Sequence, residues 1–474
     1  MQKEQLNSPA NRELDILILA AGLGTRMKSD KAKVLHRLDG RPLIAHVCRT
    51  AQSLKPRKIF VVVGYQGEDV GASARAELDD KCVALINQTQ QLGTGDAVMS
   101  ARDALRDSES TLLILSGDVP LVRAETLRAL IDHHRAHDAT ATILSVRMEN
   151  PTGYGRIVRD VDGRFQKIVE QKDATPDERQ IREINAGIYC FETGKLFKAL
   201  ARVQPVNQQG EYYLTDVAAI LLSDGEPIEV YLHNDAREVS GVNTRAELAE
   251  FENLLRRNTI RRLMLDDGVT FIDPSHAYIS GEAQLGRDCV IYPDVRIEGK
   301  TAIGNNCEIR SGTRITNSRI GDNVLIKDHC VIIDSDIAAK CSVGPFAHLR
   351  MNARLEEGSA VGNFVEVKKS RLGRGSKSMH LTYLGDATIG EKTNIGAGTV
   401  TCNYDGKRKH ETVIEDNVKI GSDTMLVAPV KVGSGSVTGA GSVVTKDVPP
   451  DTLVAGVPAV IKKRLVERED EKQG

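Results

Sequence analysis

The second half of the chain places an aliphatic residue at every sixth position. Seven such residues follow one another without a slip, and the spacing continues with slips of one residue as far as Val444. The seven are Ile279, Leu285, Ile291, Ile297, Ile303, Ile309 and Ile315. A six-residue period is typical of a parallel β-helix, where each step forms one side of a triangular coil and the aliphatic side chain points inward. We therefore predict a β-helix with small residues or glycine at its corners.

The repeat is interrupted once, over residues 401–413 (TCNYDGKRKHETV). This segment lacks the inward aliphatic residues, so we predict an external loop, and functional residues are often found on such loops. Aromatic residues make up only 4% of the chain, which contains no Trp. A narrow β-helical interior leaves little room for an indole ring, and the composition therefore agrees with the predicted fold.

The first half of the chain alternates short aliphatic runs with helical patterns. The predicted strands are Asp15–Leu19, Lys58–Val63, Thr111–Leu115, Thr140–Val146, Ala186–Phe191 and Ile228–Leu232, and the predicted helices include Pro42–Leu54, Gly95–Leu105 and Ala124–His137. Strands that alternate with helices predict parallel pairing in an α/β layer fold. Functional residues of such a fold lie at the carboxyl ends of the strands.

These patterns divide the chain into five segments. We expect a polar N-terminal extension (1–13), an α/β domain (14–243), a linker helix (244–265), the β-helix (266–460) and a charged tail (461–474). Thr244 and Glu247 have the spacing of a capping box, which marks the start of the linker helix. The tail is dense in charges of both signs, so we expect it to be disordered.

The charge balance argues against several classes of function. The chain has 63 basic and 65 acidic residues and a net charge of −2, which predicts neither nucleic-acid binding nor a polybasic membrane surface. No apolar run approaches the ~20 residues of a membrane span, and the polar N-terminus does not resemble a secretory signal. Eight cysteines without a C-x-x-C pair do not predict a disulfide framework. We expect a soluble cytoplasmic protein.

The first predicted strand runs directly into a glycine-rich turn, from Ala20 to Met27. Such a turn can direct backbone N–H groups at a phosphate. It has neither the G-K-[ST] of a Walker loop nor the G-x-G-x-x-G of a dinucleotide fold, and an ordinary tight turn is the alternative. Arg26 and Lys33 favour the phosphate interpretation because both cations could neutralise a polyphosphate.

Further motifs resemble those of one enzyme family. They are LAAGLGTRM with Lys33, QTQQLGTGDA (88–97), SGDVPL (116–121), PTGYGRI (151–157), VEQKDA (169–174), EINAGIY (183–189), GEYYLTD (210–216) and GVN (241–243). Together they resemble the bifunctional N-acetylglucosamine-1-phosphate uridyltransferase/glucosamine-1-phosphate acetyltransferases, over essentially residues 14–460. The resemblance implies a Rossmann-like nucleotidyltransferase domain followed by a left-handed parallel β-helix.

The resemblance implies a site for uridyl transfer in the first half. The sugar-1-phosphate oxygen would attack the α-phosphorus of UTP and pyrophosphate would leave, helped by Mg²⁺, without a protein nucleophile. Two residues depart from the family pattern: Leu23 replaces a lysine and Ala32 replaces a proline. The implied residues are Leu19, Ala20, Ala21, Gly22, Arg26 and Lys33 for the phosphates, Gln88, Gly93, Thr94, Ser116, Gly117 and Asp118 around the nucleotide, Gly155, Glu170 and Asn185 for the sugar, and Asp118 and Asn243 for Mg²⁺.

The resemblance also implies acetyl transfer from acetyl-CoA to glucosamine-1-phosphate in the second half. His380 would be the general base, since histidine suits proton transfer near neutral pH. The implied sugar-phosphate site consists of Arg350, Lys368, Tyr383, Asn394, Asn403 and Tyr404, and the implied acetyl-CoA site of Ala397, Ser422 and Ala440. Gly456 stands where some members carry a coenzyme-contacting arginine. The family forms trimers through its β-helices, so a homotrimer is implied.

The predicted function is therefore the two-step synthesis of UDP-N-acetylglucosamine, a precursor of peptidoglycan and lipopolysaccharide. One alternative is a nucleotidyltransferase whose β-helix is only a structural prop, and another is a non-catalytic sugar-nucleotide sensor. A zinc-dependent carbonic anhydrase is disfavoured. The histidines of the coils, His329, His348, His380 and His410, lack the H-x₄-H pair that such a site needs.

Overall fold

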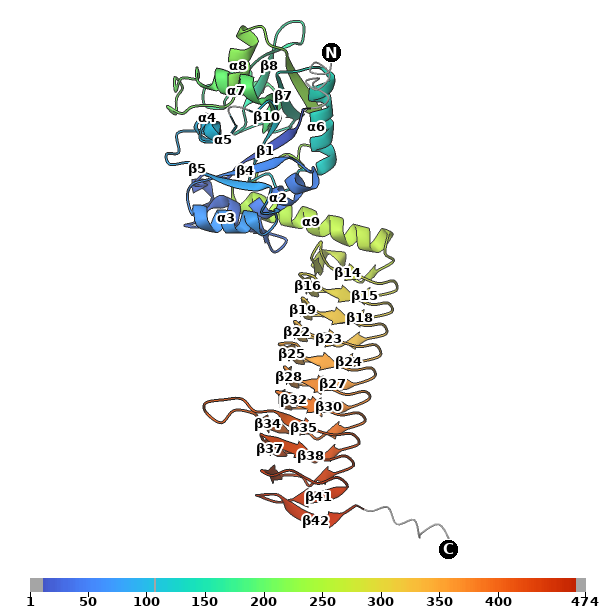
Figure 1. The fold of residues 1–474 in the computed structure, drawn as a ribbon. Coiled ribbons are helices and arrows are strands. Elements are labelled where there is room, and N and C mark those ends of the chain that lie inside the picture. Colours follow the sequence, from blue (N-terminus) through green and yellow to red (C-terminus); the bar gives the residue numbers. More distant parts are fainter. Residues whose placement is uncertain (1–11, 106–107, 466–474) are drawn as a thin grey trace, which may run out of the picture. The chain divides into compact units, whose positions relative to one another are not determined.

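A computed structural model describes residues 12–105 and 108–465 (Figure 1). The chain divides into two compact units, residues 1–252 and 253–474. The domain limits expected from the sequence stay predictions, and most of the expected N-terminal extension lies outside the described residues. None of the helices in these ranges is long and apolar enough to span a bilayer.

The first unit is built on one twisted sheet with the strand order β11-β7-β10-β6-β1-β4-β5. The strands β8 and β9 extend it beside β10, and β2 and β3 form a separate hairpin. The bounds are β1 (Leu14–Leu19), β2 (Arg37–Leu38), β3 (Arg41–Pro42), β4 (Lys58–Val63), β5 (Val83–Asn87), β6 (Thr111–Ser116), β7 (Ala141–Arg147), β8 (Arg156–Arg159), β9 (Phe165–Val169), β10 (Glu183–Glu192) and β11 (Ile228–His233).

Four strand pairings of this sheet are parallel, as predicted. The other four are antiparallel: β10 is antiparallel to β6, β7 and β8, and β9 is antiparallel to β8. The expectation of parallel pairing was therefore wrong for the predicted strand Ala186–Phe191. The chain reverses between β8 and β9, which pair antiparallel. β10 follows β9 through the short 3-10 turn η4 (Glu178–Gln180) and lies on the other side of β8, also antiparallel to it. β9 and β10 therefore run in the same direction, opposite to the other strands of the sheet.

Helices cover both faces of the sheet (Figure 1). The predicted helix Gly95–Leu105 is in fact two helices, because the chain turns at Ser100 and Ala101. The Ser100 hydroxyl donates to the Asp96 carbonyl at 3.0 Å, a bond that competes with regular helix geometry. The bounds are α2 (Leu43–Ser53), α3 (Gly67–Arg75), α4 (Thr94–Met99), α5 (Arg102–Leu105), α6 (Ala124–Ala136), α7 (Thr193–Leu200), α8 (Asp216–Ser223) and α9 (Arg245–Leu265), with the 3-10 turns η2 (Thr25–Met27) and η3 (Lys33–Leu35).

The helix α9 begins with the predicted capping box. The Glu247 N–H donates to Thr244 Oγ1 at 3.2 Å, and Glu247 Oε2 accepts from the Thr244 N–H at 2.9 Å. The same carboxylate accepts from the backbone N–H of Asn243 at 2.6 Å. The cap therefore also fixes the backbone of Asn243, a predicted magnesium ligand.

The second unit is a left-handed parallel β-helix whose short strands form three faces. The first face contains β12 (Thr270–Phe271), β15 (Val290–Ile291), β18 (Glu308–Ile309), β21 (Leu325–Ile326), β24 (Ser342–Val343), β27 (Ala360–Asn363), β30 (Lys377–His380), β33 (Asn394–Ile395), β36 (Lys419–Ile420), β39 (Val437–Thr438), β41 (Thr452–Ala455) and β42 (Val460–Arg464). The second face contains β13 (Tyr278–Ile279), β16 (Arg296–Glu298), β19 (Arg314–Thr316), β22 (Val331–Ile333), β25 (His348–Arg350), β28 (Glu366–Lys368), β31 (Tyr383–Gly385), β34 (Val400–Cys402), β37 (Met425–Val427) and β40 (Val443–Val444). The third face contains β14 (Gln284–Leu285), β17 (Ala302–Ile303), β20 (Arg319–Ile320), β23 (Asp336–Ile337), β26 (Arg354–Leu355), β29 (Arg371–Leu372), β32 (Ala387–Ile389), β35 (Thr412–Ile414) and β38 (Val430–Val432).

The aliphatic repeat forms the core of this unit. On the first face, Ile309, Ile326 and Val343 pair in register on successive coils, and all three are buried. Ser378 takes the same inward position between Val361 and Ile395. A serine at this inward position accounts for the gap in the aliphatic repeat, and its buried hydroxyl has no hydrogen-bond partner among the described residues.

The corners differ from the prediction of small residues and glycine. Many of them carry a larger residue with a left-handed backbone, including Asp288, Asn306 and Asn323 with φ of 58°, 54° and 59°. Asn and Asp tolerate this conformation because their short side chains can hydrogen-bond locally. Bulky residues also occur there, among them Phe364 with φ of 56°.

The predicted external loop is present but shorter than expected. It projects from the coils between β34 and β35 (Figure 1). Thr401 is not part of it: its side chain points inward, is fully buried, and accepts from the Gly385 N–H at 2.8 Å. The predicted disordered tail was also wrong over its first residues, because β42 pairs antiparallel with β41. The remainder of that tail, 466–474, lies outside the described residues.

Candidate functional sites

The carboxyl ends of β1 and β6 border a cleft of about 390 Å³ in the first unit. The two strand ends are joined by a hydrogen bond from the Gly117 N–H to the Leu19 carbonyl at 2.9 Å. Ten of the predicted residues line this cleft: Leu19, Ala20, Ala21, Gly22, Lys33, Gln88, Gly93, Thr94, Ser116 and Asp118. The sequence motifs therefore converge on one concave site at the edge where parallel strands usually bind ligands.

The two cations predicted to bind phosphate lie on short helical turns at the end of the glycine-rich turn and shortly after it. Arg26 lies in η2 and Lys33 begins η3. Gly24 has a left-handed φ of 67°, and a Cβ atom there would collide with the side chain of Lys33. Only glycine therefore allows Lys33 to fold back over the turn.

These cations meet the predicted magnesium ligands. The Lys33 ammonium forms an ion pair with Asp118 Oδ2 and donates to Asn243 Oδ1 at 3.2 Å. Arg26 Nη2 donates to the same Asn243 oxygen at 2.8 Å. The Val242 N–H donates to the Asp118 carbonyl at 2.9 Å, which holds the two ligand-bearing segments together. Two oxygens and two cations thus form one polar cluster beside the cleft.

The loop around Gln88 is held by its neighbours. Gln88 Nε2 donates to Asp96 Oδ2 at 2.7 Å, which fixes the orientation of the amide and leaves its oxygen free of this bond. Thr94 Oγ1 accepts from the Leu214 N–H at 3.1 Å. Gly93 has a φ of 113°, and a Cβ there would lie 2.6 Å from the Tyr212 carbonyl. A larger residue at this position would push the two loops apart.

Two further polar residues line the cleft although the sequence analysis did not select them. Gln91 donates from Nε2 to the Ala21 carbonyl at 2.9 Å, and Glu211 lies at the rim. Both stand inside motifs that the analysis quoted, QTQQLGTGDA and GEYYLTD. The motifs therefore included both residues, but only the three-dimensional structure shows that these two side chains line the cleft.

The three predicted sugar contacts form a neighbouring group that does not line the cleft itself. The Asn185 N–H donates to the Gly155 carbonyl at 2.9 Å, and a Cβ on Gly155 would lie 3.3 Å from Glu170 Oε1. Burial raises the pKa of Glu170, and a hydrogen bond from Thr215 Oγ1 at 3.3 Å opposes that shift. Thr215 is another residue that the sequence analysis missed.

The two departures from the family pattern have different surroundings. Leu23 is exposed at the cleft. Ala32 is buried and has a φ of −51°, close to the range that proline requires. Its N–H, which a proline would lack, donates to Gln66 Oε1 at 2.8 Å. The hydrogen bond to Gln66 therefore fixes a backbone conformation that proline would otherwise fix through its ring.

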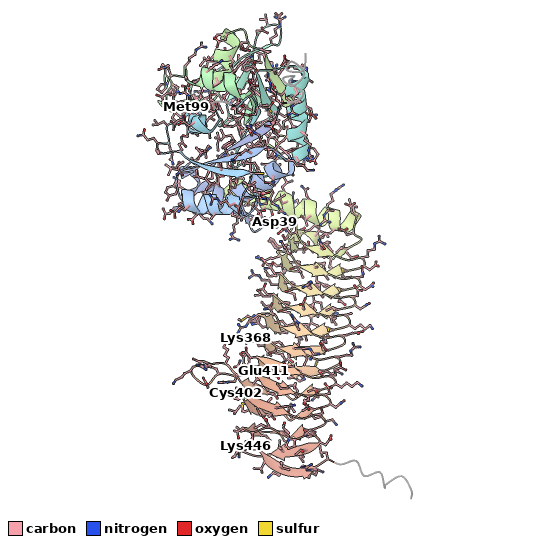
Figure 2. The ribbon with its side chains drawn as sticks, viewed as in Figure 1. Asp39, Met99, Lys368, Cys402, Glu411 and Lys446 are labelled. Carbon is pink, nitrogen blue, oxygen red and sulfur yellow. The ribbon has the colours of Figure 1, made fainter. Side chains whose placement is uncertain are left out.

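In the second unit, the predicted phosphate cations lie on adjacent coils. Arg350 pairs in register with Lys368 across β25 and β28, and Arg350 forms an ion pair with Glu366 at 2.7 Å. Lys368 is buried, and it lies on the side from which the external loop projects (Figure 2). Its ammonium lowers the pKa of Lys409, which comes from that loop. Two neighbouring ammonium groups suit a phosphate, and the sequence analysis missed Lys409.

His380 is exposed at the end of β30, and its ring has a defined partner. His380 Nδ1 lies 2.8 Å from Oδ1 of Asn363 on the preceding coil. An amide oxygen only accepts hydrogen bonds, so Nδ1 carries the proton and Nε2 of the neutral ring has a free lone pair. The sequence analysis did not select Asn363, because nothing in the repeat marks it as a partner of His380.

The residues predicted to contact acetyl-CoA form a column along one corner. The Asp423 N–H donates to the Ala397 carbonyl at 2.6 Å, and the Gly441 N–H donates to the Ser422 carbonyl at 2.8 Å. Ala397, Ser422 and Ala440 therefore occupy equivalent positions on successive coils. The pairing of β30 with β33 sets His380 at the same position one coil earlier. Asn394 is exposed on β33, two residues before the corner glycine Gly396.

The two predicted loop residues differ in their surroundings. Asn403 is buried, and its Nδ2 donates to Asp386 Oδ2 at 2.7 Å and reaches the Tyr383 hydroxyl at 3.5 Å. The exposed Tyr404 instead bonds within its own loop, to the Gly406 carbonyl at 2.7 Å. The structure thus brings Asn403 to Tyr383 but leaves Tyr404 apart from them.

Comparison with known proteins relates both units to transferases. Residues 16–186 match a MobA-like NTP transferase domain, residues 274–372 a GMPPB C-terminal domain, and residues 411–446 a bacterial transferase hexapeptide (six repeats). A bifunctional protein GlmU from Syntrophomonas wolfei is 48% identical over 441 residues, covering 93% of this chain and 97% of that relative. Those from Geobacillus sp. and Heliobacterium modesticaldum are 48% and 49% identical, covering 95% and 96% of this chain and 97% and 96% of the relatives.

Proposed function

Because the chain belongs to the bifunctional GlmU family, we propose that the two sites described above carry out its two reactions. The chain is a glucosamine-1-phosphate N-acetyltransferase and an N-acetylglucosamine-1-phosphate uridyltransferase, and it acts in UDP-N-acetylglucosamine synthesis. The observation that carries this conclusion is that the relatives align over both units. The alternatives of an inert β-helix and of a sugar-nucleotide sensor therefore lose their support.

For uridyl transfer, we assign UTP to the cleft beside β1 and β6. The loop from Leu19 to Gly22 would approach the phosphates, and Gln88 would present its free amide oxygen to the uracil edge. Arg26 and Lys33 would neutralise the triphosphate, while Gly155, Glu170 and Asn185 would hold the sugar. The acceptor phosphate then attacks the α-phosphorus in line, so that positioning and charge neutralisation supply the catalysis.

We assign the Mg²⁺ site to Asp118 and Asn243. Their side-chain oxygens already converge on one positive charge, the Lys33 ammonium, which supports a cation site at this point. Carboxylate and amide oxygens are ligands that Mg²⁺ accepts, together with phosphate oxygens and waters. Bound there, Mg²⁺ supplies charge neutralisation for the triphosphate. Lys33 would then turn from Asp118 toward the phosphates.

For acetyl transfer, we assign His380 as the general base. Its Nε2 lone pair, fixed by Asn363, is oriented to take the proton of the attacking amine. The amine nitrogen forms a bond to the thioester carbonyl carbon, the C–S bond breaks, and the coenzyme leaves as a thiol. Arg350, Lys368 and Lys409 would bind the sugar phosphate, and Tyr383, Asn394, Asn403 and Tyr404 would contact the sugar and the intermediate. The column of Ala397, Ser422 and Ala440 would accept the coenzyme.

A coupled assay tests the two activities together. Glucosamine-1-phosphate, acetyl-CoA and UTP are supplied with Mg²⁺, and each is omitted in turn. Free thiol should appear without UTP, whereas pyrophosphate should require all three substrates. Pyrophosphate release from glucosamine-1-phosphate and UTP without acetyl-CoA would contradict the proposed order of reactions.

Replacing the phosphate-binding cations should raise the acetyltransferase KM for glucosamine-1-phosphate. A charge-assisted hydrogen bond contributes ~1.5–3 kcal/mol, so we expect a rise of roughly ten- to a hundred-fold for Arg350→Ala and for Lys368→Met. Methionine keeps the buried stem of Lys368, which separates charge from packing. Arg319→Ala, an exposed arginine on an earlier coil, is the matched control. A lower melting temperature with an unchanged KM would contradict the assignment.

We also propose that the chain forms a homotrimer through the β-helix, next to His380. Phe346, Phe364 and Leu381 follow one another along one corner and are 47%, 57% and 62% exposed. The two phenylalanine rings stack with centroids 5.4 Å apart, and His329 stacks on Phe346 at 5.2 Å. A continuous apolar ridge of this kind favours contact with another protein surface, and a second copy of the chain would cover it.

Phe364→Asp should weaken the trimer. Aspartate tolerates the left-handed φ of 56° at this corner better than phenylalanine, so the fold of the single chain should survive. The new carboxylate would be buried at the interface, where an unpaired charge is costly. Light scattering should show a smaller species and acetyl transfer should fall, while uridyl transfer persists. Val161→Asp, at an exposed position in the first unit, is the control. A trimer of unchanged stability would refute the interface.

A further inference from the structure

Two histidines and one glutamate form a cluster that neither reaction uses. His133 lies near the end of α6, His137 follows one turn later, and Glu229 lies on the edge strand β11. One nitrogen or oxygen ligand atom from each side chain lies within 4.8 Å of the others. No second group of three such side chains occurs in residues 12–105 and 108–465.

The hydrogen bonds of this cluster leave ligand atoms available. His137 Nδ1 lies 2.9 Å from the His133 carbonyl, which can only accept, so Nδ1 carries the proton. In the neutral ring, Nε2 of His137 then has a free lone pair. Histidines that bind metals commonly donate their other ring N–H to a backbone carbonyl in this way, which fixes the tautomer and the ring orientation.

The other two side chains are already close to ligand geometry. His133 Nε2 and Glu229 Oε2 are 3.3 Å apart. Ligands at ~2.0–2.2 Å from a tetrahedral metal lie about 3.4 Å from one another, so this pair needs little adjustment. The His133 ring also packs 4.1 Å from the His137 ring and 5.4 Å from the Tyr231 ring, measured between centroids. Tyr231 therefore supports the ring of His133 from the same strand that carries Glu229.

We propose that His133, His137 and Glu229 bind a divalent transition-metal ion, with Zn²⁺ as the best match. Two imidazoles, one carboxylate and a water complete the tetrahedral coordination that zinc favours. The carbonyl end of α6 carries partial negative charge, which also favours a cation here. Mg²⁺ is a poor match, because it prefers oxygen ligands.

This site lies away from the nucleotide cleft within the first unit. Glu229 pairs with Thr142 near the amino ends of β11 and β7, whereas the cleft is at the carboxyl ends of β1 and β6. β6 and β7 run in the same direction, because both are antiparallel to β10. The histidine–glutamate cluster and the cleft therefore lie at opposite ends of the strands. The bound metal would therefore join α6 to the edge strand β11 and stabilise the unit, without entering the uridyl reaction.

Calorimetric titration of Zn²⁺ into the untagged, chelator-treated full chain tests the site. We expect one Zn²⁺ per chain and an affinity for Zn²⁺ lower by at least about 100-fold in His133→Gln and in His137→Gln. Removing a residue that only hydrogen-bonds to a metal ligand already lowers metal affinity by about 10- to 100-fold, and removing the ligand itself should lower it further. His276→Gln is the matched control, because His276 is exposed and contacts a carboxylate of Asp273 alone at 2.7 Å. Co²⁺ should give the visible absorption of a tetrahedral site in the wild type and in this control only.

Thermal unfolding gives a second measurement that does not depend on activity. Zn²⁺ at 100 times its Kd should raise the melting temperature of the first unit by on the order of 5 °C, and Mg²⁺ should not. This rise should disappear in His137→Gln. Glu229→Gln, which is nearly isosteric, tests the third ligand if a histidine variant fails to fold. Absence of Zn²⁺ binding to the wild type, or equal affinity in all the variants, would overturn the proposal.

Discussion

Replacing His380 by alanine should lower kcat/KM for acetyl transfer by ~10²–10⁴-fold, the usual contribution of a positioned general base. The amine of glucosamine-1-phosphate is largely protonated near neutral pH, so the reaction must lose a proton before or during attack. His380 offers the acceptor, since its Nδ1 is bonded to Asn363 at 2.8 Å and its Nε2 lone pair is free. Uridyl transfer should be unchanged, because the cleft belongs to the other unit.

The pH profile distinguishes a base from a purely structural residue. The pH dependence of kcat/KM for acetyl transfer should differ between the wild type and His380→Ala, because the variant has no imidazole to accept the proton of the amine. Asn363→Ala should have a smaller effect, mainly on kcat, because it only orients the ring. His348→Ala, a histidine on the second face two coils earlier, is the control. Near-wild-type acetylation by His380→Ala across the pH range would exclude the base assignment and make Tyr383 the next candidate.

The fold was predictable where one residue type repeats in a regular position. Each inward aliphatic residue, such as Ile309 or Val343, faces the same surroundings on every coil, so the period alone determines the architecture. The corners were not predictable in this way. The left-handed turn tolerates Asn, Asp and glycine for different reasons. Phe364 adopts the same left-handed backbone although this conformation is unfavourable for a bulky residue, and its side chain lies on the exposed apolar ridge.

The direction of β10 and the break in the helix after Met99 were also missed. Both depend on local features, the antiparallel β8–β9 pair that reverses the chain before β10 and the Ser100 hydrogen bond to Asp96 at 3.0 Å. Aliphatic patterns report burial and say little about such local bonds. The same limit explains the shortened external loop, since Thr401 is a polar residue that turns inward.

The residues of the candidate sites were likewise predictable only in part. Motifs indicated residues that lie on the glycine-rich turn or directly after a strand, such as Lys33 and Asp118. The residues that orient or supplement them were not indicated. Asn363 forms a hydrogen bond with His380 from the preceding coil, and Lys409 of the external loop lies beside Lys368. Gln91 donates a hydrogen bond to the Ala21 carbonyl. These contacts join residues distant in sequence or separated by a coil, so only the three-dimensional arrangement could reveal them.

The ion pair between Lys33 and Asp118 suggests how the free enzyme stabilises the two proposed metal ligands. Asp118 and Asn243 would otherwise present oxygens to one point without a cation. Lys33 supplies the charge from the start of η3, and Gly24 of the glycine-rich turn allows its close approach. Binding of the nucleotide with its metal would exchange this ion pair for contacts between Lys33 and phosphate.

Asp118→Asn should therefore reduce uridyl transfer by at least about 100-fold while acetyl transfer stays nearly intact. Asparagine keeps the size of the side chain and one acceptor oxygen, but it removes the negative charge that attracts Mg²⁺. Part of the lost rate should return at high Mg²⁺, because a weakened site can still be filled by mass action. The measurement is pyrophosphate release against Mg²⁺ concentration, with N-acetylglucosamine-1-phosphate and UTP as substrates.

A matched control separates the metal from general effects of charge. Asp162→Asn removes a carboxylate from an exposed turn of the same unit and should leave the Mg²⁺ dependence unchanged. In the free enzyme, Asp118→Asn also removes the partner of Lys33, so a modest loss of thermal stability is expected without metal. A requirement for more Mg²⁺ together with a lower maximal rate would agree with a metal ligand. Normal pyrophosphate release at ordinary Mg²⁺ would contradict the assignment of Asp118 as a metal ligand.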